Sequence, residues 1–230
     1  MIKNLNRSLF PVSGSLFLIT VFLLFNSISY ANEKASQCTG SDVVVKFSNI
    51  DDYYMACRSV NELMDVAQKI GLNEDLNISI LFVDSLSINI TGKSLAVFNP
   101  NTMKIEVLSI AASQKNFGDE AVLGLQMDKE LHRSVITHEL AHALFWQNMK
   151  KTIIAREIHE YFAYVIQLSL LDPSHRKEII AANDVPAFLD RSEMTEEYYL
   201  LNPTRFAVKS YLHFVNRNND WPSLLRLFKE

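Results

Sequence analysis

The segment from Lys129 to Gln147 constrains this chain most, because it reads as one apolar helix with three titratable side chains in its middle. His138, Glu139 and His142 form the pattern His-Glu-x-x-His. Positions i and i+4 of a helix share one face about one turn apart, so both imidazoles can bind the same metal ion. The alternative is a helix with two core histidines bonded to the backbone. That alternative leaves three titratable groups on one helix unexplained.

A second apolar helix, predicted over residues 153–171 and ended by Asp172-Pro173, offers a third ligand. Its polar residues recur at helical spacing and share one face; they are Glu157, Glu160, Tyr161 and Tyr164. A catalytic zinc site usually has three protein ligands and one open position. We predict Glu160 as the third ligand, because it lies near the centre of the apolar stretch. A solvated acidic patch on an amphipathic helix is the alternative.

The neighbours of Glu160 are assigned supporting roles. Tyr164, one turn further on, is expected to form a hydrogen bond beside the metal ligands. Glu157 lies nearer the helix start, where it either favours the helix dipole or orients a ligand histidine. Solvent exposure without a role is the alternative for Glu157. His159 points to another side of the helix and is not expected to bind the metal.

His-Glu-x-x-His followed by a glutamate 18 positions after the second histidine resembles the gluzincin class of metallopeptidases. The chain looks most like small exported gluzincin-like proteins of the peptidase-MA-like group, over about residues 129–171. The resemblance implies one Zn²⁺ per chain, held by His138, His142 and Glu160, and a peptide or protein substrate. The best-known members carry an aspartate, which orients a zinc histidine, where this chain has Tyr164.

The resemblance also implies a reaction and two further features of the site. Zinc would lower the pKa of a water molecule and polarise the scissile carbonyl, and Glu139 would act as the general base. A Tyr or His from the C-terminal half typically stabilises the oxyanion. The candidates are Tyr198, Tyr199, Tyr211 and His213, and we assign Tyr211 and His213 because they lie on a helix predicted over Phe206 to Val215. The strand Met103 to Leu108, or the strand paired with it, could bind an extended peptide by strand addition.

Two other functions are compatible with the motif. The first is a catalytically silent, zinc-bound module that binds a peptide or protein, although nothing in the motif is degraded. The second is a zinc hydrolase that cleaves a different acyl bond with the same chemistry.

The N-terminus is typical of a secretory signal peptide over residues 1–31. Lys3 and Arg7 precede an apolar run, Leu16 to Phe25, and Ser29-Tyr30-Ala31 supplies small residues at the cleavage positions. We therefore predict a periplasmic or secreted protein without stable membrane insertion after cleavage; an uncleaved anchor is the alternative. Cleavage removes two basic residues and changes the formal net charge from −4 to −6. Nothing in this charge suggests nucleic acid as a partner.

Cys38 and Cys57 are the two cysteines of the chain. In an exported protein such a pair most simply forms a disulfide that closes a loop of about 20 residues. Ligation of a metal by the thiolates is the alternative, and no histidine cluster lies near them in the sequence.

The remaining pattern predicts one α+β domain over residues 32–230, with a short mixed or antiparallel sheet followed by a helical half. The predicted strands are residues 43–47, 78–83, 95–98 and 103–108, with a hairpin turn at 99–102. A helix over Ser59 to Ile70 is expected to end at Gly71. A loop over residues 109–128 could form the rim of a cleft; a long loop that is merely mobile is the alternative.

Overall fold

A five-stranded mixed sheet followed by a helical half confirms the predicted α+β class. The computed structural model describes residues 33–87, 94–118, 121–149 and 154–225, all within one compact unit, Ala31–Glu230. The predicted signal peptide, residues 1–31, lies outside the described residues.

The sheet has the strand order β1-β2-β3-β5-β4, and its strands are β1 (Lys34–Gln37), β2 (Val44–Phe47), β3 (Ser79–Val83), β4 (Ala96–Asn99) and β5 (Lys104–Leu108). Strands β2, β3 and β5 are parallel, whereas β1 and β4 pair antiparallel at the two edges. All four strands expected from the sequence are present, and a tight turn joins β4 to β5 as predicted. The sequence missed β1, because all four of its residues are exposed and no apolar alternation marks them.

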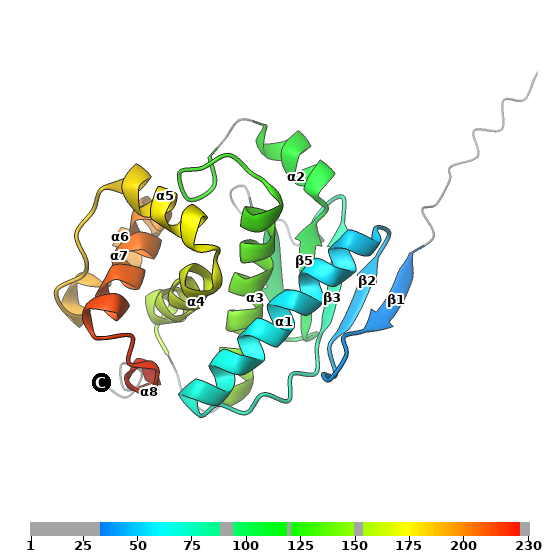
Figure 1. Ribbon diagram of the computed structural model, residues 1–230, viewed down its shortest axis with the longest axis horizontal. Coiled ribbons are helices and arrows are strands. Elements are labelled where there is room, and N and C mark those ends of the chain that lie inside the picture. The colour runs from blue at the N-terminus through cyan, green and yellow to red at the C-terminus, as the bar shows by residue number, and fades with distance from the viewer. Residues whose placement is uncertain (1–32, 88–93, 119–120, 150–153, 226–230) are drawn as a thin grey trace, which may run out of the picture. The chain divides into compact units, whose positions relative to one another are not determined.

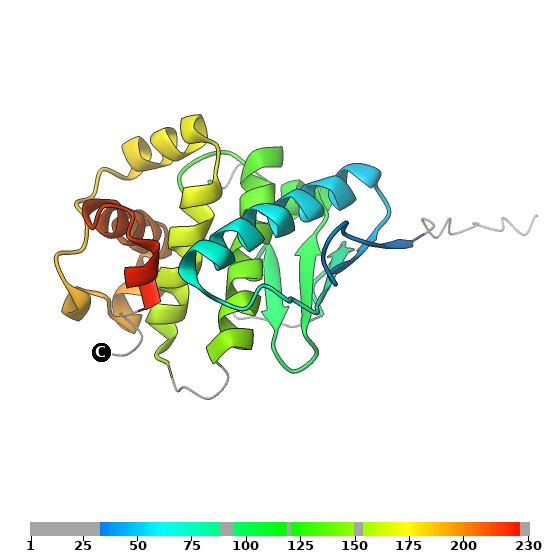
Figure 2. The same cartoon turned by 60° about the horizontal axis from the view of Figure 1, so that its bottom comes forward.

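The helices are α1 (Ile50–Ile70), α2 (Ile110–Phe117), α3 (Lys129–Met149), α4 (Arg156–Leu170), α5 (Pro173–Asn183), the 3-10 helix η1 (Arg191–Glu193), α6 (Glu196–Leu201), α7 (Pro203–Asn216) and α8 (Trp221–Leu224). Figures 1 and 2 show α3 between the sheet and the group formed by α4, α5, α6 and α7. Alternate strand residues are buried on one sheet face and join the core, among them Val45, Ile80 and Ile105. Among the described residues, no helix is both long and apolar enough to cross a membrane.

Helix α1 ends where the sequence predicts but begins nine residues earlier, at Ile50. The side chain of Asn49 accepts a hydrogen bond from the backbone N–H of Asp51 and so caps the first turn. Gly71 ends the helix in the left-handed conformation with φ 79°, which a residue without a Cβ adopts at little cost. The early start places α1 alongside the first turns of α3.

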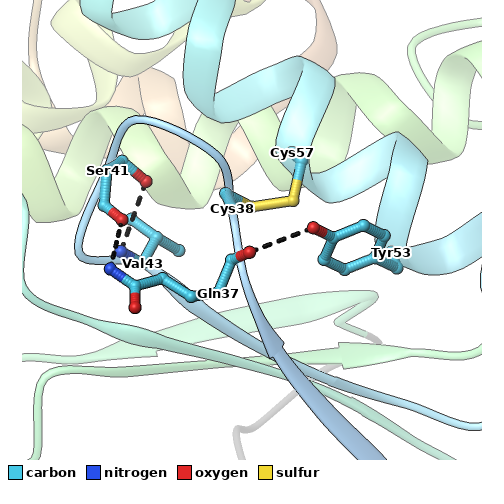
Figure 3. The surroundings of a disulfide bond; sticks show 6 residues. All are labelled: Gln37, Cys38, Ser41, Val43, Tyr53 and Cys57. Carbon is cyan, nitrogen blue, oxygen red and sulfur yellow. Dashed lines mark hydrogen bonds between the residues drawn. A yellow bond between two sulfur atoms is a disulfide. The ribbon is translucent and has the colours of Figure 1, made fainter.

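The predicted disulfide between Cys38 and Cys57 is present, with 5.3 Å between the two Cα atoms (Figure 3). It joins the segment after β1 to the second turn of α1. The hydroxyl of Tyr53 donates to the carbonyl of Gln37 at 3.0 Å and ties the same two elements together. The disulfide is compatible with an exported protein, since such bonds persist in oxidising compartments.

The segment expected to be one loop, residues 109–128, contains helix α2. Ser109 caps it by accepting a hydrogen bond from the N–H of Ala112. The loop prediction is therefore wrong for residues 110–117, because a serine cap and a short run of small and apolar residues favour a helix there. Phe117 and residues 121–123 line the cleft described below, so the expected position at the rim is correct.

The first turns of α3 carry polar side chains that are buried and fully engaged by the protein. Arg133 donates to Glu62 of α1 at 2.5 Å, to Glu130 at 2.9 Å and to the carbonyl of Leu170 at 2.7 Å. One guanidinium thus joins α1, α3 and the end of α4. His132 places Nε2 2.7 Å from the carbonyl oxygen of Leu108 in β5. These contacts fix α3 between the sheet and α4.

Candidate metal centre

The middle of α3 brings His138 and His142 together on the helix face that meets α4. Their Nε2 atoms lie 3.1 Å apart, and the rings meet edge to face with centroids 4.7 Å apart. This is the arrangement expected for residues at i and i+4 of one helix. Both side chains are partly buried.

Helix α4 packs against α3 (Figure 2). It supplies Glu160 to the same point. Its Oε2 lies 3.4 Å from Nε2 of His138, and its Oε1 lies 3.7 Å from Nε2 of His142. Tetrahedral zinc with bonds of about 2.0–2.2 Å holds neighbouring donor atoms roughly 3.4 Å apart. The three observed separations lie close to this value, so the cluster could hold a metal ion.

The charges of the cluster favour a cation at this point. Burial alone would raise the pKa of Glu160, but the two imidazoles hold it well below its usual range. Burial also disfavours the charged form of His142, yet the carboxylates of Glu160 and Glu139 outweigh it and raise the pKa of this imidazole. An ionised carboxylate and two imidazole nitrogen atoms therefore lie together at one buried position, where they could bind a cation.

Gln167 orients His138, a role that was not predicted from the sequence. Its Oε1 lies 3.0 Å from Nδ1 of His138, and its Nε2 donates to the hydroxyl of Ser134 at 3.0 Å. An acceptor at Nδ1 keeps the proton on that nitrogen, which leaves Nε2 free to bind a metal. Gln167 is seven residues after Glu160, on the same helix face, and that spacing is the signal that could have found it.

Tyr164 contacts His138 through its ring, with centroids 4.6 Å apart. Burial and the nearby Glu160 carboxylate raise the pKa of Tyr164 well above its usual value. Tyr164 was expected to form a hydrogen bond beside the ligands, but the bond to His138 comes from Gln167 one turn further on. Tyr164 therefore supports the site mainly by packing.

Glu139 is positioned by the edge strand of the sheet. Its Oε2 accepts a hydrogen bond from the backbone N–H of Phe98 in β4 at 2.7 Å. The donor lies 41 positions earlier in the chain, so no local sequence pattern predicts this bond. The bond fixes one carboxylate oxygen of Glu139 at the wall of the cleft.

A cleft of about 960 Å³ runs beside the cluster and is open to solvent. The metal-binding candidates and Glu139 line it together with Gln167, Tyr164 and Tyr199. Its other walls are largely apolar and include Leu95, Ala96, Val97, Phe98, Pro100, Phe117, Val122, Leu123, Val135, Trp146 and Leu200. A cleft of this size and lining is suited to an organic ligand with apolar groups.

The assignment of Tyr211 and His213 to the site is wrong. Nδ1 of His213 lies 2.8 Å from the hydroxyl of the buried Tyr161, in the interior between α4 and α7. Tyr211 lies under the guanidinium of Arg176, 5.6 Å from its ring centroid. Neither residue lines the cleft, which α7 reaches only with its first residues, Pro203 and Thr204.

Tyr199 is the member of the candidate set that lines the cleft. Burial and the Glu160 carboxylate raise the pKa of its hydroxyl, which therefore stays protonated as a hydrogen-bond donor. Tyr198 instead packs on Phe188 and Phe206 in the core of the helical half.

Two other residues of α4 depart from their expected places. Glu157 accepts a hydrogen bond from Arg191 at 3.1 Å and does not orient a ligand histidine, although it does lie in the first helical turn. Tyr161 turns into the core, away from the face of Glu160. His159 packs on Phe145 and stands outside the cluster, as expected.

The fold and the site define an α+β protein whose two histidines and one glutamate could hold a metal ion beside an open cleft. The chain belongs to a family of unknown function, DUF6639, whose model matches residues 43–229. Neither a protein with a curated description nor a solved structure matches it.

Proposed function

We propose that this protein is an exported zinc metallopeptidase, a hydrolase of peptide bonds. The observation that carries the proposal is the convergence of His138, His142 and Glu160 with donor atoms 3.1 to 3.7 Å apart. Two neutral imidazoles and one carboxylate are a donor set that zinc accepts in catalytic sites. Glu139 lies on the same wall, and the cleft leaves room for a substrate.

Different residues of this chain have different roles in hydrolysis. A bound zinc ion would supply Lewis acidity at this point. Glu139, held through Oε2 by the N–H of Phe98, presents its other carboxylate oxygen to the attacking water. It accepts the proton of that water and delivers it to the leaving amine. Gln167 keeps His138 in the tautomer that binds metal.

Tyr199 is our candidate for stabilising the oxyanion. Its protonated hydroxyl stands in the cleft near Glu160 and can donate a hydrogen bond to charge that develops on the scissile carbonyl. Tyr199 replaces Tyr211 and His213 in this role.

Strand β4, not β5, is the edge at which an extended peptide would bind. Leu95 and Leu108 form a hydrogen-bonded pair, so the alternation of an antiparallel ladder turns the backbone groups of Ala96 and Phe98 outward. Two bonds agree with this direction: Phe98 N–H donates to Glu139, and Ser94 donates to the carbonyl of Ala96. Both residues line the cleft; a peptide that adds along this edge would pair with the other two outward groups, the N–H of Ala96 and the carbonyl of Phe98.

The test is a comparison of the zinc-loaded wild type with Glu139→Gln against a mixed peptide library. We expect the variant to bind zinc as the wild type does and to lose about 10²- to 10⁴-fold of the cleavage rate, the usual contribution of a general base. Glu157→Gln, a matched change on a carboxylate that pairs with Arg191, should retain activity. Equal cleavage by wild type and Glu139→Gln would contradict the proposal, and binding without cleavage would favour the silent module.

A further inference from the structure

Arg156 stands one helical turn before the metal ligand on the same face of α4. Arg156, Glu160, Tyr164 and Gln167 follow one another at intervals of four, four and three residues, and all of them line the cleft. Residues four apart on a helix are separated by about 6 Å along its axis. The guanidinium is therefore placed beside the metal centre and not at a distant rim.

Arg156 is also the one arginine or lysine among the described residues that line the cleft. The two carboxylates of the cleft are already engaged: Glu160 faces the two histidines, and Glu139 accepts from Phe98. The fixed positive charge of Arg156 is thus left to act on whatever occupies the cleft.

The contacts of Arg156 hold the side chain in place and use only part of its hydrogen-bonding capacity, toward the Tyr199 hydroxyl and Glu196. Its guanidinium lies over the ring of Tyr199 at 5.3 Å from the centroid. Its closest acidic partner, Glu196, is 3.7 Å away, and both side chains are about half exposed. An ion pair of that length and exposure is weak. A guanidinium has five N–H donors, so a planar pair of them can still meet an incoming carboxylate.

We propose that Arg156 recognises a carboxylate of the substrate, one or two residues beyond the scissile carbonyl. This inference rests on the proposed peptidase function. One residue of extended chain spans about 3.3–3.6 Å, so one helical turn matches the reach of one to two residues. The carboxylate can be the C-terminus of a short peptide or the side chain of an aspartate or glutamate.

The test measures peptide binding to zinc-loaded Glu139→Gln protein by calorimetry, so that no turnover intervenes. The first probe pair is acetyl-Leu-Ala-Leu as the free acid and as the C-terminal amide. The second pair consists of longer peptides with both ends blocked that differ only in glutamate against glutamine. We expect one acidic member to bind about 10- to 100-fold more tightly than its neutral partner, as for a charge-assisted hydrogen bond.

Arg156→Gln, added to the Glu139→Gln background, should remove this preference and leave the binding of the neutral peptides unchanged. Arg156→Lys should retain part of the preference, because the charge stays but the bidentate geometry is lost. Arg205→Gln is the matched control: it removes the same charge from an exposed residue that does not line the cleft. Equal far-ultraviolet circular dichroism of all variants confirms that each is folded.

The outcomes distinguish a C-terminal carboxylate from an acidic side chain, and they test carboxylate recognition by Arg156 separately from the peptidase function. A preference in the free-acid pair assigns the C-terminal carboxylate, and a preference in the glutamate pair assigns the acidic side chain; either supports the inference. Equal binding of acidic and neutral peptides, or a preference that survives Arg156→Gln, would overturn the inference while leaving the peptidase proposal intact. Protein that neither binds zinc nor any peptide would overturn both.

Discussion

Helix α3 carries histidines in two contrasting settings, His132 near its start and the pair His138 and His142 in its middle. His132 is fully buried, and the protein engages both of its ring nitrogens: Nε2 faces the carbonyl of Leu108, and Nδ1 faces the sulfur of Met55 at 3.4 Å. His138 and His142 instead turn their Nε2 atoms toward each other and toward Glu160. Among the described residues, no backbone acceptor meets these two Nε2 atoms, which could therefore bind a metal ion.

The contrast teaches that the partner of each ring nitrogen, more than burial, separates a structural histidine from a ligand. His132 serves the packing of α3 on the sheet, as Arg133 serves the packing of α3 on α1 and α4. Six residues further along the helix, at His138, the same residue type faces a cleft and a carboxylate. Mutations at the start of α3 should therefore change the stability of the protein. Mutations at His138 and His142 should change its metal affinity.

The largest expected effect is the loss of metal binding in His138→Ala. We expect zinc affinity to fall by about a thousandfold, since sites with four protein ligands bind zinc with about 10–16 kcal/mol and each ligand contributes a sizeable share. Competitive titration against a chromophoric chelator measures this. His132→Ala is the counterpart: zinc affinity should be unchanged, whereas unfolding in urea should show a loss of about 2–4 kcal/mol. Similar zinc affinities for the two variants would contradict the assignment of His138 as a metal ligand and His132 as a structural residue.

Arg133→Ala should give the largest loss of stability in the structural region. Its guanidinium is buried, and its removal takes a donor from the carbonyl of Leu170 and the buried cation from Glu62 and Glu130, which keep only the bonds from Arg58 and from the N–H of Asp172. Breaking a buried ion pair typically costs about 3–5 kcal/mol. Urea unfolding of chelator-treated protein measures the change, with the exposed Arg58→Ala as a control that should cost less than about 1 kcal/mol. Zinc stoichiometry should stay the same in both variants.

Gln167→Leu should weaken zinc binding by about 10- to 100-fold, the usual effect of losing a residue that orients a ligand. The leucine keeps most of the volume but removes the acceptor for Nδ1 of His138. The control is Gln147→Leu on α3, where the side chain bonds the carbonyl of Asp75 and does not line the cleft. Competitive titration should show no change in the control. An unaltered affinity in Gln167→Leu would contradict the orienting role.

The smallest expected effect is a pH dependence of stability that has opposite signs at two histidines. Burial lowers the pKa of His132 in the folded protein, so the unfolded chain takes up the proton first and stability falls as the pH drops below about 6.5. The advantage of wild type over His132→Phe should shrink there by at most about 1.4 kcal/mol per pH unit. A hydrogen bond to Asp128 raises the pKa of His175. The free energy of unfolding of the wild type should therefore increase relative to that of His175→Gln as the pH falls. This increase should disappear as the pH rises.

The residues that act within one helix could be predicted from the sequence. The spacing of His138, Glu139 and His142 fixes their relative positions, because helix geometry is the same in every fold. Glu160 could be chosen on its own helix by the same rule and by the apolar residues around it. The periodic strands and the two long helices were predictable for the same local reasons.

The remainder of the site depends on contacts between elements, which no local pattern encodes. Phe98 reaches Glu139 only because β4 is the edge strand beside α3. Tyr199 faces the cleft while Tyr211 and His213 do not, and this depends on how α6 and α7 pack on α4. Gln167 lies on a predictable face, but its bond to His138 requires the separation of two helices.

The most direct test of the central claim is the anomalous diffraction of a crystal of zinc-loaded protein on both sides of the zinc absorption edge. We predict one strong difference peak per chain between Nε2 of His138, Nε2 of His142 and the carboxylate of Glu160. His132, on the same helix, should show none. The absence of a peak at the three donor atoms, or a peak at another position alone, would contradict the account.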